Sequence, residues 1–200
     1  MTVPVEIIAG PLTLFLAPVG TAFPLVTAAP AAPWAKVGTS GDRNYSDDGV
    51  SVQHSQSIEQ ARPAGAVGPV KAWRTEEDLM IMVTLWDLTL EQFTTALAGV
   101  APTTVAAGAG TPGTKRVGLS AGKAVTTYAL LARGYSAYGD AFAGQYEVPL
   151  CYQSASPKIL YAKGKPAGIE LEFTALEHAA AASEAERFGR LIMQHQAPLP

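Results

Sequence analysis

Two neighbouring stretches of this chain, residues 50–59 and 79–86, constrain its fold more than any other feature. In the first, Val, His, Gln and Ile alternate with Ser, Gln and Glu, the period-two pattern of a β-strand with one polar face. The second also has the pattern of a strand, but Met80, Met82 and Trp86 lie opposite a row of Leu, Ile and Val. A small isolated sheet rarely covers both faces of a strand. We therefore expect an assembling β-protein in which a neighbouring subunit covers one face.

A short helix is expected directly after the second stretch, at about residues 89–97. Thr89 is a suitable N-cap, and Gln92 three residues later completes a capping box. Gly99 stands where a left-handed residue commonly ends a helix. The residues at helical spacing on its apolar face are Leu90, Phe93 and Leu97. This helix is predicted to cover an edge or a face of a sheet.

Shorter alternating stretches predict the remaining strands. They lie at residues 7–17, 34–37, 115–119, 124–133, 145–153 and 169–174, and the third and fourth are expected to pair as a hairpin. Pro149 places its strand at an edge or beside a bulge, because proline cannot donate to a ladder. The low-complexity stretch between Gly99 and Pro112 is expected to be a loop. These patterns predict a mainly β fold, an antiparallel β-sandwich or half-open barrel with one short packed helix and long loops.

The end of the chain is ambiguous between helix and strand over residues 183–194. Ser183 and Glu186 form a second capping-box pattern, which favours a helix. Gly189, together with the family resemblance given below, instead favours a short helix near 180–187, followed by a strand at about 188–194. The second interpretation is preferred here.

Composition limits the function further. The chain of 200 residues is long enough for one core, so a single domain covering residues 1–200 is expected. Its net charge is −3 and its longest basic run is Lys115-Arg116, which argues against a surface that grips nucleic acid. The single Cys151 excludes an internal disulfide and favours a reducing, intracellular assembly site. Residues 7–35 lack charge, but their prolines and the missing basic n-region argue against a membrane span or a signal peptide.

No motif in the sequence carries recognisable chemistry. Gly108, Gly110 and Gly113 match the spacing of a dinucleotide loop without a strand before it or a helix after it. The three histidines are too dispersed to form a local metal motif with Cys151, which is expected on the same strand face as Glu147. The sequence therefore predicts no catalytic, cofactor-binding or metal-binding residues, and no enzyme.

The order of three blocks, a DDGV strand, an RTEED strand and a TLEQ helix, resembles the tail tube proteins of long-tailed bacteriophages and of phage-derived gene-transfer particles. An N-terminal AGPLTLFLAPVGTAFP segment and a C-terminal GIELEFTALEHA segment extend the resemblance, in pieces, along nearly the whole chain. The resemblance implies a structural virion protein that forms hexameric rings, which stack into a hollow tube for DNA delivery. It also implies assembly in the host bacterial cytoplasm with a tape-measure protein, a tail-tip or distal tail protein and a tail terminator. DNA would pass through the tube without being bound specifically.

Two sets of residues are candidates for this role. The loops at 38–49 and 61–76 are expected to contact neighbouring subunits or rings through Tyr45, Asp47, Asp48, Trp73, Arg74 and Glu76. Carboxylates on the polar side of alternating strands are expected to line the lumen, where they would repel phosphates. These are Glu59, Glu147, Glu170 and Glu172.

Two alternative functions remain open from the sequence. One is another tail or head–tail component of similar fold, such as a terminator, a connector or a sheath-enclosed tube subunit. The other is a small-molecule-binding β-barrel whose pocket is lined by Trp34, Trp86 and Tyr128. The sequence leaves open the ring symmetry, the type of tail and the strand face that lines the lumen.

Overall fold

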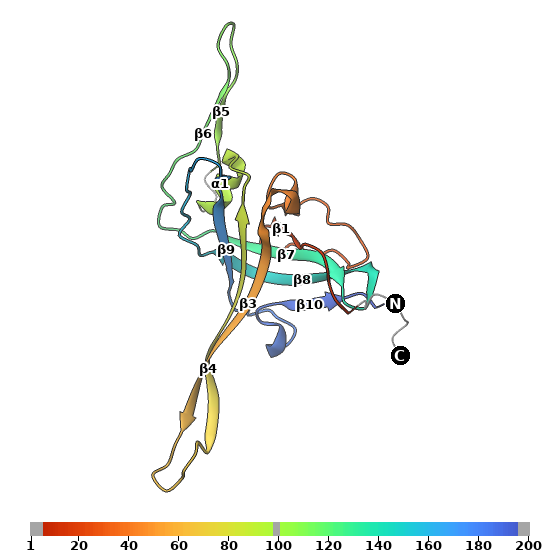
Figure 1. The fold of residues 1–200 in the computed structure, drawn as a ribbon, viewed down its shortest axis with the longest axis vertical. Coiled ribbons are helices and arrows are strands. Elements are labelled where there is room, and N and C mark those ends of the chain that lie inside the picture. The colour runs from red at the N-terminus through yellow and green to blue at the C-terminus, as the bar shows by residue number, and fades with distance from the viewer. Residues whose placement is uncertain (1–5, 98–100, 196–200) are drawn as a thin grey trace.

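The computed structural model describes residues 6–97 and 101–195. They form a mainly antiparallel β structure with one short α-helix, and the sheet does not close into a barrel (Figure 1). The described strands are β1 (Thr13–Ala17), β2 (Ala35–Lys36), β3 (Tyr45–Ala61), β4 (Lys71–Leu85), β5 (Thr103–Val105), β6 (Thr114–Arg116), β7 (Thr127–Ser136), β8 (Gly139–Gln153), β9 (Ile169–Ala175) and β10 (Arg190–Met193). The mainly β sandwich with a short helix that the sequence predicts is confirmed.

The main sheet divides at β8, which has different neighbours along its length. Its strand order is β2-β1-β7-β8-β9-β4-β3, and β10 pairs separately with β8. Residues 144–147 of β8 pair with β10, whereas residues 151–153 pair with β9. The two branches therefore diverge from one long strand, and they leave β3 and β10 as edges of a half-open fold.

Pro149 lies where β8 changes its neighbour, at a bulge opposite β7. Tyr128 pairs with Cys151 and Leu130 pairs with Val148, so two residues of β8 oppose one residue of β7. The predicted bulge at Pro149 is thus confirmed. Because of the extra residue, Val148 and Cys151 both enter the main core although they are three positions apart. The expectation that Cys151 shares a strand face with Glu147 is wrong for the same reason.

The main core lies on one face of β9 and β4, where apolar residues pair directly across the ladder. Ile81 pairs with Phe173, and Val83 pairs with Leu171; all four side chains are buried. On the opposite face, Met82 pairs with Glu172 and both are half-buried. The strand at 79–86 is therefore apolar on both faces as predicted, and one of these faces stays half-exposed in a single chain.

Helix α1 (Leu90–Ala96) follows β4, close to the predicted range, and Gly99 lies outside the described residues. Thr89 is its N-cap, but the predicted capping box is wrong, because the Thr89 side chain makes no capping hydrogen bond to the first turn of the helix. Gln92 instead accepts a hydrogen bond at Oε1 from the Gly38 N–H, 3.0 Å away. This long-range bond fixes the loop after β2 against the helix.

The predicted hairpin of residues 115–119 and 124–133 is wrong. Strand β6 pairs with β5, which lies in the stretch expected to be a loop, whereas β7 pairs with β1 and β8. Strands β5 and β6 have three exposed residues each, so neither has the buried face that produces alternation. At the other end of the chain, a 3₁₀ turn at Glu184–Glu186 precedes β10, which agrees with the preferred interpretation of 183–194.

The hydroxyl of Tyr45 and the thiol of Cys151 are buried, and burial raises the pKa of each group to about 12. The Tyr45 hydroxyl accepts a hydrogen bond from the Leu14 N–H and donates one to the Val37 carbonyl, both at 3.0 Å. It therefore connects β1, the segment after β2 and the start of β3. Tyr45 was expected to contact a neighbouring subunit, and its burial in the core contradicts that expectation.

These two groups predict alkaline destabilisation. Below the ordinary pKa values of 9.0 for Cys and 10.0 for Tyr, both groups are protonated in the folded and unfolded chain. As the pH rises toward 12, the unfolded chain ionises first, so the free energy of unfolding falls by about 1.4 kcal/mol per pH unit and group. Urea unfolding at several alkaline pH values gives the free energy of unfolding, which should fall less steeply with pH for Cys151→Ala and Tyr45→Phe than for the wild type. An equally steep fall in all three proteins would contradict the raised pKa values of the two groups.

Candidate assembly surfaces

The most prominent surface of the molecule is a long arm, residues 55–78, formed by the ends of β3 and β4. It projects from one end of the body, while the β5–β6 hairpin projects from the opposite end (Figure 1). All residues of β4 from Lys71 to Asp78 are exposed. Hydrogen bonds within the arm hold its strands together: Arg74 Nε donates to Gln56 Oε1 at 2.9 Å, and Ser57 Oγ donates to Glu76 Oε2 at 3.1 Å. Arg74 also pairs with Glu77 at 3.2 Å.

A register shift in the arm determines which side chains share a face. Ser57 pairs with Glu76 and Ile58 pairs with Arg74, so Thr75 is an extra residue of β4. Beyond the shift, Glu59 pairs with Trp73. Because paired residues point to the same side of a sheet, Glu59 and Trp73 share a face with Glu76, and Arg74 lies on the other face.

The same face continues along the body onto β9. Asp78 pairs with Ser55 on the arm, Met82 pairs with Glu172, and Thr84 pairs with Glu170. We call this surface the acidic face; its carboxylates are Glu59, Glu76, Asp78, Glu170 and Glu172. Within the described strands β3, β4 and β9, Lys71 near the arm tip is the single basic residue on this side. The structure therefore brings three of the four predicted lumen carboxylates, Glu59, Glu170 and Glu172, onto one face.

Glu147, the fourth predicted lumen residue, is not on this surface. Its side chain is only 3% exposed, so the expectation that it faces a lumen is wrong. The segment at 18–33 covers this part of β7 and β8: Gln145 Nε2 donates to the Pro24 carbonyl at 2.8 Å, and Phe23 packs with Trp34 over Leu131. The alternation in β8 is real, but a distant part of the chain buries its polar side.

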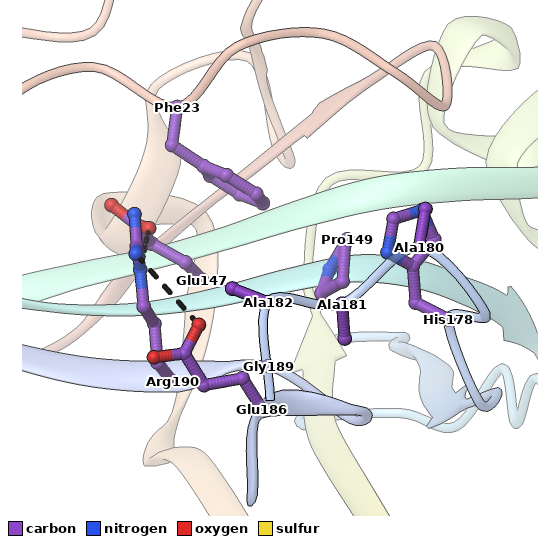
Figure 2. Close-up of a pocket in the computed structure, with 10 residues that line it drawn as sticks. All are labelled: Phe23, Glu147, Pro149, His178, Ala180, Ala181, Ala182, Glu186, Gly189 and Arg190. Atoms are coloured by element: carbon purple, nitrogen blue, oxygen red, sulfur yellow. Dashed lines mark hydrogen bonds and ion pairs between the residues drawn. The ribbon is translucent and has the colours of Figure 1, made fainter. Parts of the chain in front are cut away.

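Figure 2 shows the cavity of about 170 Å³ that borders Glu147. The carboxylate accepts a hydrogen bond from Arg190 Nε at 2.7 Å and another from Gln145 Nε2 at 2.6 Å. Glu186 approaches the same guanidinium, with 3.9 Å between Oε2 and Nη1. The hydrogen bond and negative charge of Glu147 raise the pKa of Arg190. This arrangement ties β8 to β10 and the preceding turn, and we interpret it as a structural ion pair.

The predicted contact residues fall into three places. Trp73, Arg74 and Glu76 lie together on the exposed long arm. Asp47 and Asp48 are exposed in an irregular part of β3, where the residues between Tyr45 and Val50 bulge from the ladder. Tyr45 belongs to the core, as described above. Only the arm group is therefore placed to reach far from the body.

A basic surface that no sequence pattern predicted lies at the end opposite the arm. Residues 101–126 and 154–168 contain six exposed cations and no Asp or Glu: Lys115, Arg116, Lys123, Lys158, Lys163 and Lys165. Both segments lie at the α1 end of the body, because one follows α1 and the other leads into Ile169, which pairs with Leu85 (Figure 1). We call them together the basic cap. Its cations are too widely spaced to form a basic run, but the absence of acids from both segments is a signal in the sequence.

The predicted ligand pocket does not form from its three residues. Trp34 is buried in the second core cluster, Trp86 is 43% exposed and Tyr128 packs against the main core. An apolar groove of about 440 Å³ lies elsewhere, between β3 and β10. Its apolar lining includes Val52, Leu79, Tyr146, Phe188 and Leu191.

The described residues contain no group of three or more His, Cys, Asp or Glu side chains positioned to hold a metal ion. Over residues 6–97 and 101–195, no helix has the length and apolar character needed to cross a membrane. Comparison with known proteins finds no matching family model and no matching curated sequence.

Proposed function

We propose that this chain is the major tail tube subunit of a siphophage-like or gene-transfer-agent-like particle. Copies form homohexameric rings, and the rings stack into a hollow tube through which DNA passes into the host cell. The subunit is assembled in the bacterial cytoplasm and becomes part of the virion. Its partners are further copies of itself, a tape-measure protein, a tail-tip or distal tail protein and a tail terminator.

The observation that carries this proposal is the pair of hairpins that project from opposite ends of a half-open body (Figure 1). A contact between two different surfaces of identical subunits can repeat along an axis without closing. The edges of β3 and β10 provide further surface for neighbours within a ring. These features support a subunit whose surfaces are covered in an assembly.

The acidic face supports a channel through which DNA moves. Glu170 and Glu172 lie on the body side of this face, next to Met82 and Thr84. A surface of carboxylates repels DNA phosphates, which is the opposite of the counterion-release binding that basic grooves provide. We therefore assign the body part of this face, which carries Glu170 and Glu172, to the lumen of the tube.

Negative-stain electron microscopy of the purified chain across a concentration series, with light scattering, tests the proposal. We expect rings and hollow tubes of uniform width that lengthen as the concentration rises. Single rings that never stack would favour a terminator or a connector instead. A chain that stays monomeric at every concentration, and also after addition of a tail-tip complex, would contradict the proposal.

The groove between β3 and β10 favours a second candidate function, the binding of a small apolar molecule. Its apolar side chains and open side are typical of a ligand site. Saturable binding of an apolar dye by a monomeric chain, lost in Leu191→Asp, would favour this candidate over the tail tube.

A further inference from the structure

The charges of this chain are separated along its length. Six of its 14 Lys and Arg residues, and none of its 17 Asp and Glu residues, belong to the basic cap. The rest of the chain therefore has eight cations against 17 carboxylates. A net charge of −3 therefore conceals two segments that carry cations and no carboxylates.

The cap is built from exposed groups that remain available to a partner. Lys158, Lys163 and Lys165 extend from the 154–168 segment, and all three are exposed. Lys115 is partly neutralised by Glu91, with 2.5 Å between Nζ and Oε1, and both side chains are about half-exposed. Large apolar side chains accompany the cations and are also exposed: Val105, Leu119, Val125, Leu160 and Tyr161. Exposed apolar side chains that are rimmed by polar residues often mark a protein interaction site.

The long arm at the other end carries four carboxylates and three cations, and one of its faces has the complementary, acidic character. Glu59, Glu76 and Asp78 lie on one face with Trp73, which is 47% exposed. Other apolar side chains of the arm are exposed as well: Ile58, Val67 and Val70. The two projecting ends together hold half of the large hydrophobic side chains that are exposed in the described residues.

We infer that the basic cap binds the long arm of a second copy of this chain, head to tail. The carboxylates Glu59, Glu76 and Asp78 of one copy face Lys158, Lys163 and Lys165 of the next, and Trp73 packs among the apolar cap residues. This inference rests on the proposed stacking of rings and names its axial contact. It assigns Glu59 to the contact, whereas Glu170 and Glu172 remain on the body for the channel.

Such a contact also determines the polarity of growth. Cap against cap brings like charges together, and like-charge juxtaposition disfavours the wrong orientation. The attraction between exposed charges falls as ionic strength rises, because the Debye length is about 8 Å at physiological salt. Axial growth is therefore expected to weaken with added salt.

Reversal of charge on either end, and on both together, tests the inference. We expect the cap variant Lys158→Glu/Lys163→Glu/Lys165→Glu to raise the concentration needed for stacking by about tenfold or more, the equivalent of at least 1.4 kcal/mol. The arm variant Glu59→Lys/Glu76→Lys/Asp78→Lys should have the same effect. A chain with all six changes should stack again, because attraction is restored with the signs exchanged. The matched control, Lys158→Arg/Lys163→Arg/Lys165→Arg, keeps the charge and should stack like the wild type.

The possible outcomes distinguish a failure of the contact between cap and arm from a failure of the tail tube proposal. Sedimentation and electron microscopy follow stacking, and circular dichroism confirms that each variant is folded. Tubes that form normally in both reversal variants overturn the contact but leave the tail tube proposal standing. A wild-type chain that does not self-associate, even after addition of a tail-tip complex, overturns both. Salt-dependent retention of the wild type on DNA, lost in the cap variant while stacking persists, would assign the cap to nucleic acid instead.

Discussion

Replacement of Arg190 by alanine is expected to lower the free energy of unfolding by about 3 kcal/mol, because it leaves the Glu147 carboxylate buried without its cation. The side chain of Glu147 is 3% exposed and that of Arg190 is 50% exposed, so the carboxylate is the group that bears the cost. Gln145 Nε2 continues to donate one hydrogen bond, and this limits the loss. Urea unfolding at neutral pH measures the effect.

A variant that also removes the buried carboxylate gives a sharper test. The double change Glu147→Gln/Arg190→Met should be milder than Arg190→Ala, because no buried charge remains. An equal loss of stability in both variants would show that Arg190 acts through packing alone.

The strands that the sequence predicts well are those with one face in the core. Residues 169–174 alternate because Leu171 and Phe173 are buried while Glu170 and Glu172 are not, and this alternation is visible without a structure. Residues 79–85 of β4 also alternate between buried and half-buried side chains. Pro149 was also interpreted correctly from the sequence, since its missing N–H falls at the bulge.

The long arm was not predictable in the same way. From Lys71 to Asp78 every residue of β4 is exposed, so this part of the strand has no buried face and resembles a polar loop. These residues form a strand because they pair with β3, and the paired residues are separated in the sequence. Trp73, Arg74 and Glu76 were therefore assigned to the 61–76 loop as contact residues, although the resemblance implied an RTEED strand that begins at Arg74.

Long-range contacts explain the remaining errors. Glu147 has the alternation of an exposed carboxylate, but the segment at 18–33 covers it from more than a hundred residues away. Gln92 has the spacing of a capping residue, yet its side chain bonds to Gly38 across the fold. In both cases the local pattern is compatible with two environments of the side chain. Contacts with distant residues decide between them, and these contacts cannot be read from the residue spacing.

Truncation of the long arm is expected to abolish tube formation while leaving the body folded. Gln56 and Glu77 are paired residues, so removal of residues 57–76 and closure with Asn-Gly forms a two-residue hairpin turn at this point. The deleted residues are mostly exposed and their side-chain hydrogen bonds stay within the arm, so thermal unfolding of the body should change little.

We propose that the arm acts in assembly, because its acidic and apolar side chains are exposed far from the body. Trp73→Ala, the matching point change, should reduce stacking in an intact arm, since exposed aromatic residues often dominate interfaces. Leu25→Ala serves as the control, because Leu25 is 74% exposed but lies in the 18–33 segment, off both projecting ends. Electron microscopy should show full-length tubes for the control and none for the truncated chain. Tubes of normal width from the truncated chain would mean that rings stack through the body, and the arm would lose its assigned role.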